Sequence, residues 1–463
     1  MFCNPHRLSL LVLCSIAWLT TVGCRSTPPA HAIRDPDYAW MAAQIDAGCY
    51  APCSAIMPSA EVPELSGPQP VETLIAWAVA QNPAVEAARK QMEAASYRIP
   101  QAASLEDPML EVNPFLAPMG MGEMRQVIQM GVSQQIPWSG KLQSRAEVAA
   151  QEAQRARAQW AAAELAVIEQ VKIAYYQLYF VQQAIQISQA DRELLLGLQE
   201  IAGARFRVGQ VNQQDVLRAE LEVLELDNQL VRLQQELDTA RARLARQLSI
   251  SPDTPLEAVE QLPAEQIPAD LQHLYNLGIA ARPELHAQLA EISRARQSVD
   301  LARLDYFPDV RLSAMWMGMD MPGNGMNTTM DSGGDALLLG IGVNLPIYRQ
   351  RLDAGVREAE AQAVASARQY DALRDQTQEE VKDLFAQLQS QQELLRLLRE
   401  EIVPKADQTF EVSLRGYEVG EVTFLQLVDN RRQLLRYQIA THQLEAQLRQ
   451  SLARLERIVG GYL

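Results

Sequence analysis

Methionine thioethers are the side chains of this sequence whose type and grouping could do chemistry. Eleven of the 15 methionines fall into two short windows, one near residues 109–130 and one near residues 315–330. Thioether sulfur is a soft ligand that favours Cu(I) or Ag(I). Methionine also fills irregular apolar packing, so both interpretations stay open. The candidates for transient soft-metal contacts are Met315, Met317 and Met319, which alternate along one stretch.

The N-terminal region has the features of an export signal. A basic residue precedes an apolar run at residues 8–19, and the small residue Gly23 comes directly before Cys24. This pattern resembles a bacterial lipoprotein signal, which predicts a signal peptide at residues 1–23 and lipidation of Cys24. Thr21 stands where such signals usually have Leu. Ordinary cleavage nearby stays open as the alternative.

Residues 24–70 are rich in Pro, Ala and Ser and show no period, which predicts an extended, lipid-anchored tether. Cys49 and Cys53 lie close together within it. Because an exported protein meets an oxidising environment, a short disulfide between them is favoured over a metal site.

Several function classes are disfavoured by composition and motifs. The net charge of -16, with no basic cluster, argues against nucleic-acid binding. The sequence has no HExxH, Walker, GxSxG or paired CxxC motif, and its five histidines are scattered. We therefore expect neither an enzyme nor a bound cofactor.

The remaining chain consists of two copies of one pattern, at residues 71–250 and 251–463. Four punctuation points recur in the same order at offsets of about 200–211 residues. They are Asn82-Pro83 and Arg282-Pro283, Asp107-Pro108 and Phe307-Pro308, Ile136-Pro137 and Leu345-Pro346, and Val208-Gly209-Gln210-Val211 and Val419-Gly420-Glu421-Val422.

The apolar spacing in each copy predicts a long helix between two shorter ones. The predicted helices cover residues 72–98, 141–206 and 212–249 in the first copy, and 271–304, 350–416 and 423–459 in the second. Each long helix would extend roughly 100 Å, so the shorter helices are expected to stack end to end beside it. Residues 212–249 carry two apolar seams, Leu217-Leu221-Leu224 and Leu226-Leu230-Leu233-Leu237. Two seams predict neighbours on both sides, as in a closed coiled-coil barrel.

Between the first two helices of each copy the apolar period changes to two, which predicts β-hairpins at residues 108–136 and 308–346. After the leader, no apolar run is long enough for a membrane-spanning helix, whereas roughly 9–12 alternating residues suit a transmembrane strand. Four strands cannot close a barrel, so we expect three chains to share twelve. The predicted fold class is mainly α with a small β part. Two hairpins packed on the helices of a soluble protein are the alternative.

Period-two counting also gives the orientation of the second methionine group. Met315, Met317 and Met319 are in phase with Arg311 and Ser313. These methionines are therefore expected to face the lumen and outer mouth of such a barrel.

The complete pattern resembles the TolC-like outer-membrane efflux proteins (the outer membrane factor family) over nearly all of residues 71–460. Locally, Ile402-Val403-Pro404-Lys405-Ala406 and Gly416-Tyr417-Glu418-Val419-Gly420 resemble the second-repeat signature of this family. The resemblance implies a homotrimer in the bacterial outer membrane, with a twelve-stranded barrel and a periplasmic helical tunnel. It implies a passive exit duct that works with a periplasmic adaptor and an inner-membrane pump. The methionines suggest the heavy-metal branch, with copper or silver as cargo; cobalt, zinc, cadmium and organic cargo remain open.

The resemblance also assigns candidate sites. It makes the turns Val208-Gly209 and Val419-Gly420 the tips that the adaptor grips, although turn geometry alone could explain each glycine. It places a periplasmic gate at Asp429, with Gln426 where the family has a second acidic residue, and Asp215 and Tyr417 as partners of that gate. A solvated helix face is the alternative for Asp429. The rival to the whole assignment is a lipid-anchored periplasmic coiled-coil scaffold without a pore.

Overall fold

The computed structural model describes residues 67–119, 125–263, 268–320 and 335–461. The helices are α3 (Val71–Gln81), α4 (Pro83–Ala103), α5 (Lys141–Arg207), α6 (Gln213–Leu248), α7 (Leu271–Ala281), α8 (Pro283–Leu304), α9 (Arg349–Leu397), α10 (Val403–Val419) and α11 (Phe424–Val459), with a π-helical segment η3 (Leu398–Ile402). The strands are β1 (Gly67–Gln69), β2 (Met109–Met119), β3 (Arg125–Ile136), β4 (Leu256–Ala258), β5 (Val310–Asp320) and β6 (Ala336–Val343).

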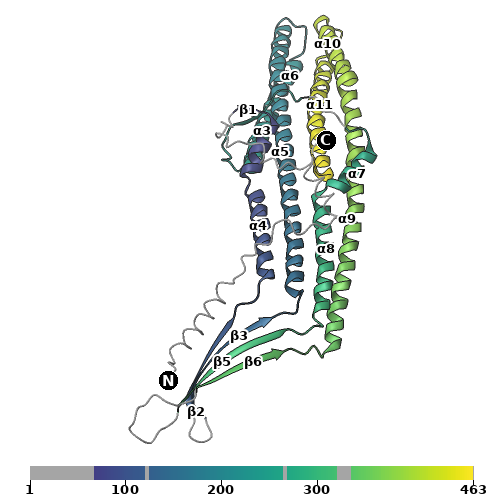
Figure 1. The fold of residues 1–463 in the computed structure, drawn as a ribbon. Helices are drawn as coiled ribbons and strands as arrows, with labels where there is room; N and C mark the ends of the chain where they lie inside the picture. The colour runs from purple at the N-terminus through teal and green to yellow at the C-terminus, as the bar shows by residue number, and fades with distance from the viewer. Residues whose placement is uncertain (1–66, 120–124, 264–267, 321–334, 462–463) are drawn as a thin grey trace, which may run out of the picture. The chain divides into compact units, whose positions relative to one another are not determined.

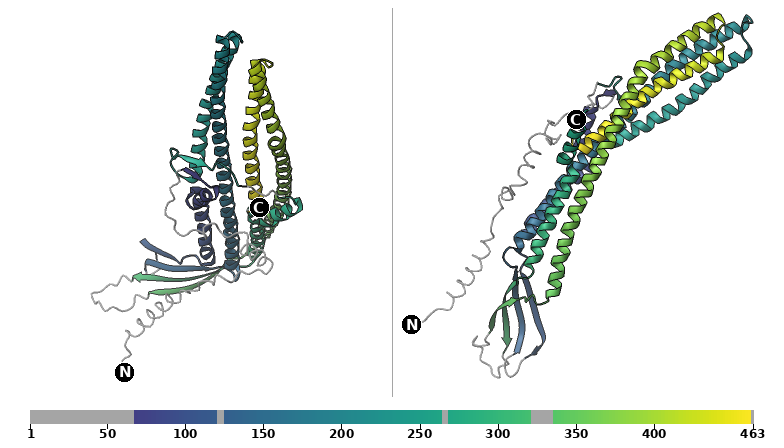
Figure 2. Two further views of the ribbon diagram at one scale, coloured as in Figure 1. Left: turned by 90° about the horizontal axis from the view of Figure 1, so that it is seen from above. Right: turned by 90° about the vertical axis from the view of Figure 1, so that its right-hand side faces the viewer.

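Two long helical segments organise the helical part. The 67-residue α5 packs along α4 and α6, and α9 packs along α8 and α11. At 1.5 Å per residue α5 is about 100 Å long. The predicted stacking of shorter helices beside the long ones is confirmed. Figures 1 and 2 show strands β2, β3, β5 and β6 at one end of these helices and the turns α5–α6 and α10–α11 at the other.

Each predicted first helix is divided in two by a proline. Asn82 and Arg282 have extended backbones before Pro83 and Pro283, because a residue before proline is pushed out of the helical region. The Asn82 side chain accepts a hydrogen bond from the Ala84 amide and donates one to the Gln247 carbonyl, each at 2.9 Å. The break is therefore tied to the end of α6.

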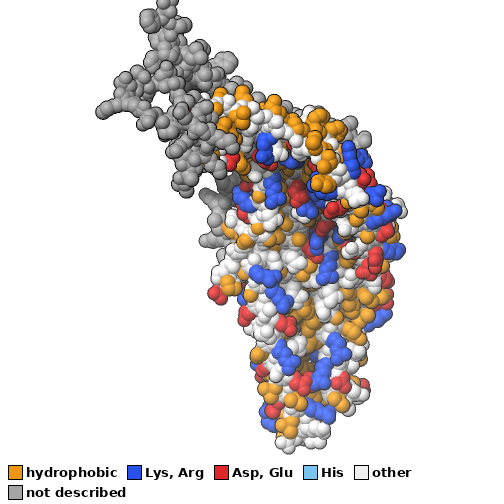
Figure 3. All heavy atoms as spheres, turned by 90° about the horizontal axis from the view of Figure 1, so that it is seen from below, with side chains coloured by type: hydrophobic (Ala, Val, Ile, Leu, Met, Phe, Trp, Pro, Cys, Tyr) orange, Lys and Arg blue, Asp and Glu red, His pale blue; other side chains and the backbone are white. Residues whose placement is uncertain are grey.

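The two predicted hairpins combine into one antiparallel sheet with the order β2-β3-β5-β6. Its register brings apolar residues into common rows on one face, such as Leu110, Val132, Ala314 and Leu339. Leu339 and Ile341 are 74% and 77% exposed in the single chain. Within the described residues, β2 and β6 each lack a second neighbouring strand. Figure 3 shows hydrophobic side chains gathered over the strands.

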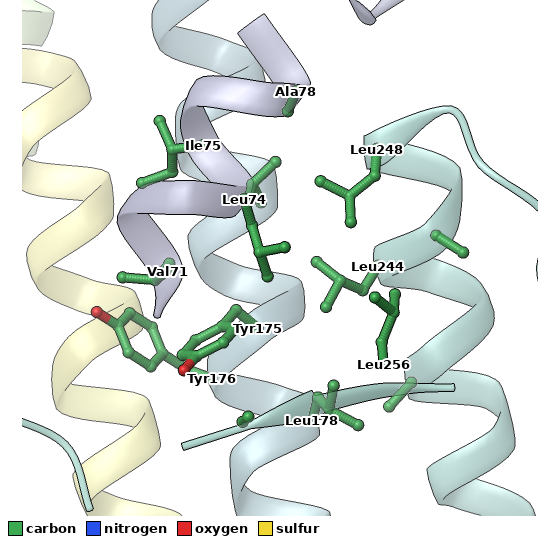
Figure 4. Packing of buried hydrophobic residues seen from close by; sticks show 14 of the residues in the cluster. Val71, Leu74, Ile75, Ala78, Tyr175, Tyr176, Leu178, Leu244, Leu248 and Leu256 are labelled. Atoms are coloured by element: carbon green, nitrogen blue, oxygen red, sulfur yellow. The ribbon is translucent and has the colours of Figure 1, made fainter. Parts of the chain in front are cut away.

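The main core lies halfway along α5, where α3, α6 and β4 meet it (Figure 4). Leu74, Tyr175, Leu178, Leu244 and Leu256 are almost completely buried there. Tyr175 Oη donates to the Gln69 carbonyl at 2.9 Å and accepts from the Val259 amide at 3.1 Å. The tyrosine thus holds the small parallel sheet β1–β4 against α5.

Strands β1 and β4 and the π-helical segment η3 were not predicted from the sequence. The β1–β4 sheet has only three residues per strand, too few for a period to show. The π-helical η3 interrupts the expected helix 350–416 just before Pro404. Among the described residues, no helix combines the length and the apolar composition needed to cross a membrane.

Candidate functional site

The two Val-Gly turns reverse the chain at the same end of the helices. Gly209 has φ +74° and Gly420 has φ +86°, in the left-handed region that glycine adopts without strain. The Gln210 amide donates to the Arg205 carbonyl at 2.9 Å, and the Glu421 amide donates to the Gly416 carbonyl at 2.8 Å. These bonds close the last turns of α5 and α10 in the manner of a helix C-cap.

Both turns present an apolar side chain to solvent. Val208 is 69% exposed and Val419 is 71% exposed. A Cβ atom built on Gly209 or Gly420 would meet no atom within 4 Å. The conformational requirement at these positions is therefore the positive φ and not crowding. Each turn therefore presents an exposed apolar side chain, which is a property that a docking surface needs.

Arg205 joins the two turns. Its guanidinium donates to the carbonyls of Tyr417 and Glu418, the latter at 2.9 Å, and lies over the Tyr417 ring at 4.8 Å from the centroid. The end of the first repeat is therefore bound to the end of the second. The sequence pattern did not point to Arg205.

Tyr417 is buried beside this arginine and packs on Phe424, with ring centroids 5.7 Å apart. Its buried hydroxyl has no hydrogen-bond partner within the described residues. Burial raises the pKa of the Tyr417 phenol; Arg205 opposes this rise, and the Asp215 carboxylate adds to it. Asp215 and Tyr417, which the family resemblance paired, thus do lie in one electrostatic neighbourhood.

Gln426 performs a local structural task. Its backbone amide donates to Thr423 Oγ1 at 3.3 Å, and the Thr423 amide donates back to Gln426 Oε1 at 3.1 Å. This reciprocal pair is the capping box that starts α11. The Thr-x-x-Gln spacing was visible in the sequence and would have revealed it.

Asp429 lies one turn further along α11 and is exposed. Its neighbour Arg432 forms ion pairs with Glu222 and Glu225 of α6, the latter at 3.1 Å. Burial raises the pKa of Glu222; Arg432 opposes this, while the negative charges of Glu225 and Asp429 add to it. The candidate gate residue therefore belongs to a mixed cluster of three carboxylates around one guanidinium.

Arg431, which directly precedes Arg432 in α11, forms a second ion pair. Asp191 of α5 is buried and accepts a hydrogen bond from Arg431, whose guanidinium lies over the Phe410 ring at 5.1 Å. Burial raises the pKa of Asp191, and Arg431 opposes the rise. A groove of about 610 Å³ between α5, α6 and α11 is lined by both arginine clusters.

At the opposite end, Met315 and Met317 lie on the polar face of the sheet. Their registered neighbours on β3 are Gly131 and Gln129, and Gln129 Nε2 donates to Met315 Sδ at 2.7 Å. Both methionines are half-buried. The backbone of Met319 continues β5, but its side chain lies outside the described residues, as do Cys24, Cys49 and Cys53 altogether.

The amino-acid sequence matches a known protein family over most of its length. A family model described as outer membrane efflux protein matches residues 74–249 and 274–461. This chain belongs to the outer membrane efflux protein family. As a member, it is an efflux channel of the bacterial outer membrane and not an enzyme.

Relatives of the efflux channel are distant in sequence. It is 22% identical over 400 residues to the cobalt-zinc-cadmium resistance protein CzcC of Cupriavidus metallidurans, which covers 86% of this chain and 91% of that protein. The structure of the outer membrane protein VceC from Vibrio cholerae matches with a TM-score of 0.70 at 21% identity, covering 85% of this chain and 96% of the other. The structure of CusC matches with a TM-score of 0.72 at 17% identity, covering 88% and 96%.

These likenesses confirm the predicted fold class, in which long coiled-coil helices continue into transmembrane β-strands. Within the part of the efflux channel that the structure describes, no three His, Cys, Asp or Glu side chains come together in a way that could hold a metal ion.

Proposed function

We propose that three copies of this chain form the exit duct of a tripartite efflux system. The observation that carries the proposal is the four-stranded sheet, which has one apolar face and, among the residues that the structure describes, an unpaired edge at both β2 and β6. In lipid, each unpaired backbone group would cost several kcal/mol. Pairing of β6 with β2 of a neighbouring copy removes both edges, and three copies give twelve strands.

The helical part supports the same assembly. Of the two seams on α6, Leu226, Leu233 and Leu237 are buried within the chain. The other seam is exposed, with Leu217, Leu221 and Leu224 at 53–63%. This seam is available for a helix of the next copy, as a closed ring requires.

Conductance in planar bilayers tests the pore directly. The purified protein should migrate as a heat-dissociable trimer and should produce discrete conductance steps when added to a bilayer. A lipid-anchored scaffold without a pore would bind the same membrane through its anchor but conduct no ions. A stable monomer without conductance would refute the exit-duct proposal.

The apolar turns at Val208-Gly209 and Val419-Gly420 are the surfaces that we assign to a periplasmic adaptor, which would connect the duct to an inner-membrane pump. Their exposure and their position at the end away from the strands support this assignment. Asp429 would form the periplasmic gate, with Asp215 and Tyr417 beside it.

Heavy-metal cations are the cargo that we favour. One relative, CzcC, is named for resistance to cobalt, zinc and cadmium. Met315 and Met317 on the polar face of the sheet add soft donors, which suit copper or silver. In cells that depend on this duct, Met315→Leu with Met317→Leu should lower tolerance to silver but not to cobalt. If the variant tolerates silver as well as the wild type does, the two thioethers do not take part in transport.

The N-terminal assignments complete the proposal. Residues 1–23 would be removed as a signal, Cys24 would carry the lipid, and residues 24–70 would form the tether with a Cys49–Cys53 disulfide. The two repeats would occupy residues 71–250 and 251–463. Mass spectrometry of the mature protein tests the anchor, because an unmodified N-terminus at or near residue 24 would exclude lipidation there.

A further inference from the structure

The same strand-to-helix turn occurs once in each repeat. The two turns differ in whether their basic side chains form ion pairs within the chain. In the first repeat the turn leads from β3 into α5, whose first residue is Lys141. The Lys141 side chain is only 4% exposed, and its Nζ lies 2.9 Å from Asp309 and 3.5 Å from Asp305. This cation is neutralised within the chain.

In the second repeat the turn leads from β6 into α9, which begins with Arg349 and Arg351. Both arginines are exposed, and neither forms an ion pair with a described carboxylate. Arg349 lies 5.6 Å from the centroid of the Tyr306 ring, while nearby Asp353 accepts a hydrogen bond from the Tyr306 hydroxyl. Among the described residues, these two guanidinium groups therefore have no carboxylate within ion-pair distance.

The position of these arginines is electrostatically unfavourable in an isolated chain. The first turn of α9 contains no acidic residue, and its N-cap, Tyr348, gives no side-chain hydrogen bond. A helix N-terminus carries partial positive charge, so two cations there repel it unless an external anion is present. A phosphate group would pair with both guanidinium groups and offset this repulsion.

The surroundings identify the source of that phosphate. The apolar face of β6 continues past the end of the strand through Leu345, Ile347 and Tyr348, which are 73%, 66% and 73% exposed. An exposed aromatic side chain between an apolar band and a cationic group is the pattern of a membrane interface. Figure 3 shows Lys and Arg side chains beside the hydrophobic side chains over the strands.

We propose that Arg349 and Arg351 bind the phosphate groups of anionic phospholipids in the periplasmic leaflet of the outer membrane. The turn lies where the apolar face of the membrane strands ends and the periplasmic helices begin, at the level of that leaflet's headgroups. A soluble phosphate compound has no use for the adjoining apolar surface, whereas an acyl chain covers it. Lys141 shows no such requirement because Asp309 already pairs with it.

Native mass spectrometry of the detergent-purified channel, incubated with equal amounts of phosphatidylglycerol and phosphatidylcholine, tests the proposal. The wild type should retain phosphatidylglycerol preferentially. Arg349→Gln with Arg351→Gln should weaken this retention by roughly fivefold per arginine, since an interfacial cation contributes about that factor. Arg232→Gln with Arg436→Gln, two exposed arginines on tunnel helices, is the charge-matched control and should retain the preference.

Three results would overturn the proposal: no preference in the wild type, equal loss in the control pair, or displacement of the lipid by millimolar inorganic phosphate, which would indicate a site for free anions. Retention of the preference in Arg349→Lys with Arg351→Lys would support it further, because charge alone attracts the headgroup. Circular dichroism of each variant establishes that it is folded. Bilayer conductance, measured separately, distinguishes a failure of lipid binding from a failure of the exit-duct proposal.

Discussion

Glu445 on α11 is a carboxylate that remains charged inside the helical wall because several donors surround it. Tyr179 Oη donates to it at 3.1 Å, Arg399 of η3 lies 2.8 Å away, and His442 Nδ1 lies 3.6 Å away. Burial alone would raise the pKa of Glu445. The interactions with His442, Arg399 and Tyr179 more than offset burial and lower the pKa of Glu445 to about 2.

This shift predicts a loss of stability in acid. The pKa of Glu445 is about 2 in the folded chain, against an ordinary value of 4.5. Its contribution to the free energy of unfolding is therefore complete above pH 4.5 and is lost as the pH falls toward 2, with a size of about 3 kcal/mol per chain. Urea unfolding followed by circular dichroism at pH 7, 4 and 3 should show this loss, and Glu445→Gln should flatten it.

The matched control is Glu236→Gln, which removes a carboxylate from an exposed position on α6. It should leave the wild-type pH dependence unchanged. If Glu445→Gln retains the full dependence, the acid sensitivity arises from other carboxylates.

At the residue scale the sequence predicted the site only in part. The pairing of Asp215 with Tyr417 as gate residues came from the family resemblance, and in the structure the Asp215 carboxylate adds to the raised pKa of the Tyr417 phenol. The contacts of Arg205, Arg432 and Lys141 each join segments that are more than 150 positions apart in the sequence. Local residue spacing therefore could not predict these contacts. Gln426 is predicted only as a gate position, whereas in the structure it also completes the capping box with Thr423.

At the scale of elements, the two turns depend on backbone conformation. Valine at a positive φ is strained by about 1–3 kcal/mol, and both glycines lie at such angles in open space. Gly209→Val with Gly420→Val should therefore distort the turns and weaken in-cell cross-linking to the adaptor, while the trimer and its conductance persist. Faster hydrogen exchange at residues 206–212 and 417–423 would locate the effect.

Gly203→Val provides the matched control for this experiment. Gly203 lies in α5 close to the turn, with an ordinary helical backbone and nothing within 4 Å of an added Cβ. It should cross-link like the wild type. Equal cross-linking by the double variant would move the docking surface away from the turns.

The elements themselves were largely predictable, because long apolar periods of 3.6 and 2 leave little ambiguity. The breaks at Pro83 and Pro283 were marked in the sequence as repeat punctuation but not as helix ends. The π-helical η3 was not predictable, since one extra residue in a helical turn changes no composition. It brings Arg399 to Glu445, a contact made across two helices.

At the scale of the whole molecule, threefold symmetry would bring three copies of Asp429 close to one another. A single chain presents one exposed Asp429, with Arg432 nearby but already paired to Glu222 and Glu225. In a trimer whose tunnel narrows at this end, three Asp429 carboxylates would converge on the axis. At about 6–8 Å, their repulsion at an effective dielectric near 20 is of order 2–3 kcal/mol per pair.

That repulsion favours a bound cation, which predicts how the channel is blocked. Asp429→Asn should weaken block by a trivalent cation applied from the periplasmic side, because the ring loses its charge. Gln426→Glu should deepen the block, since Glu adds a second acidic ring and still completes the capping box with Thr423. Gln426→Asp is a poorer test, because its shorter side chain would also disturb the start of α11.

Single-channel conductance with and without the trivalent cation measures both changes. Asp238→Asn, at an exposed position on α6, controls for surface charge. If block is the same in all variants, Asp429 faces solvent on the outer side of the tunnel, and its assignment to the gate is wrong.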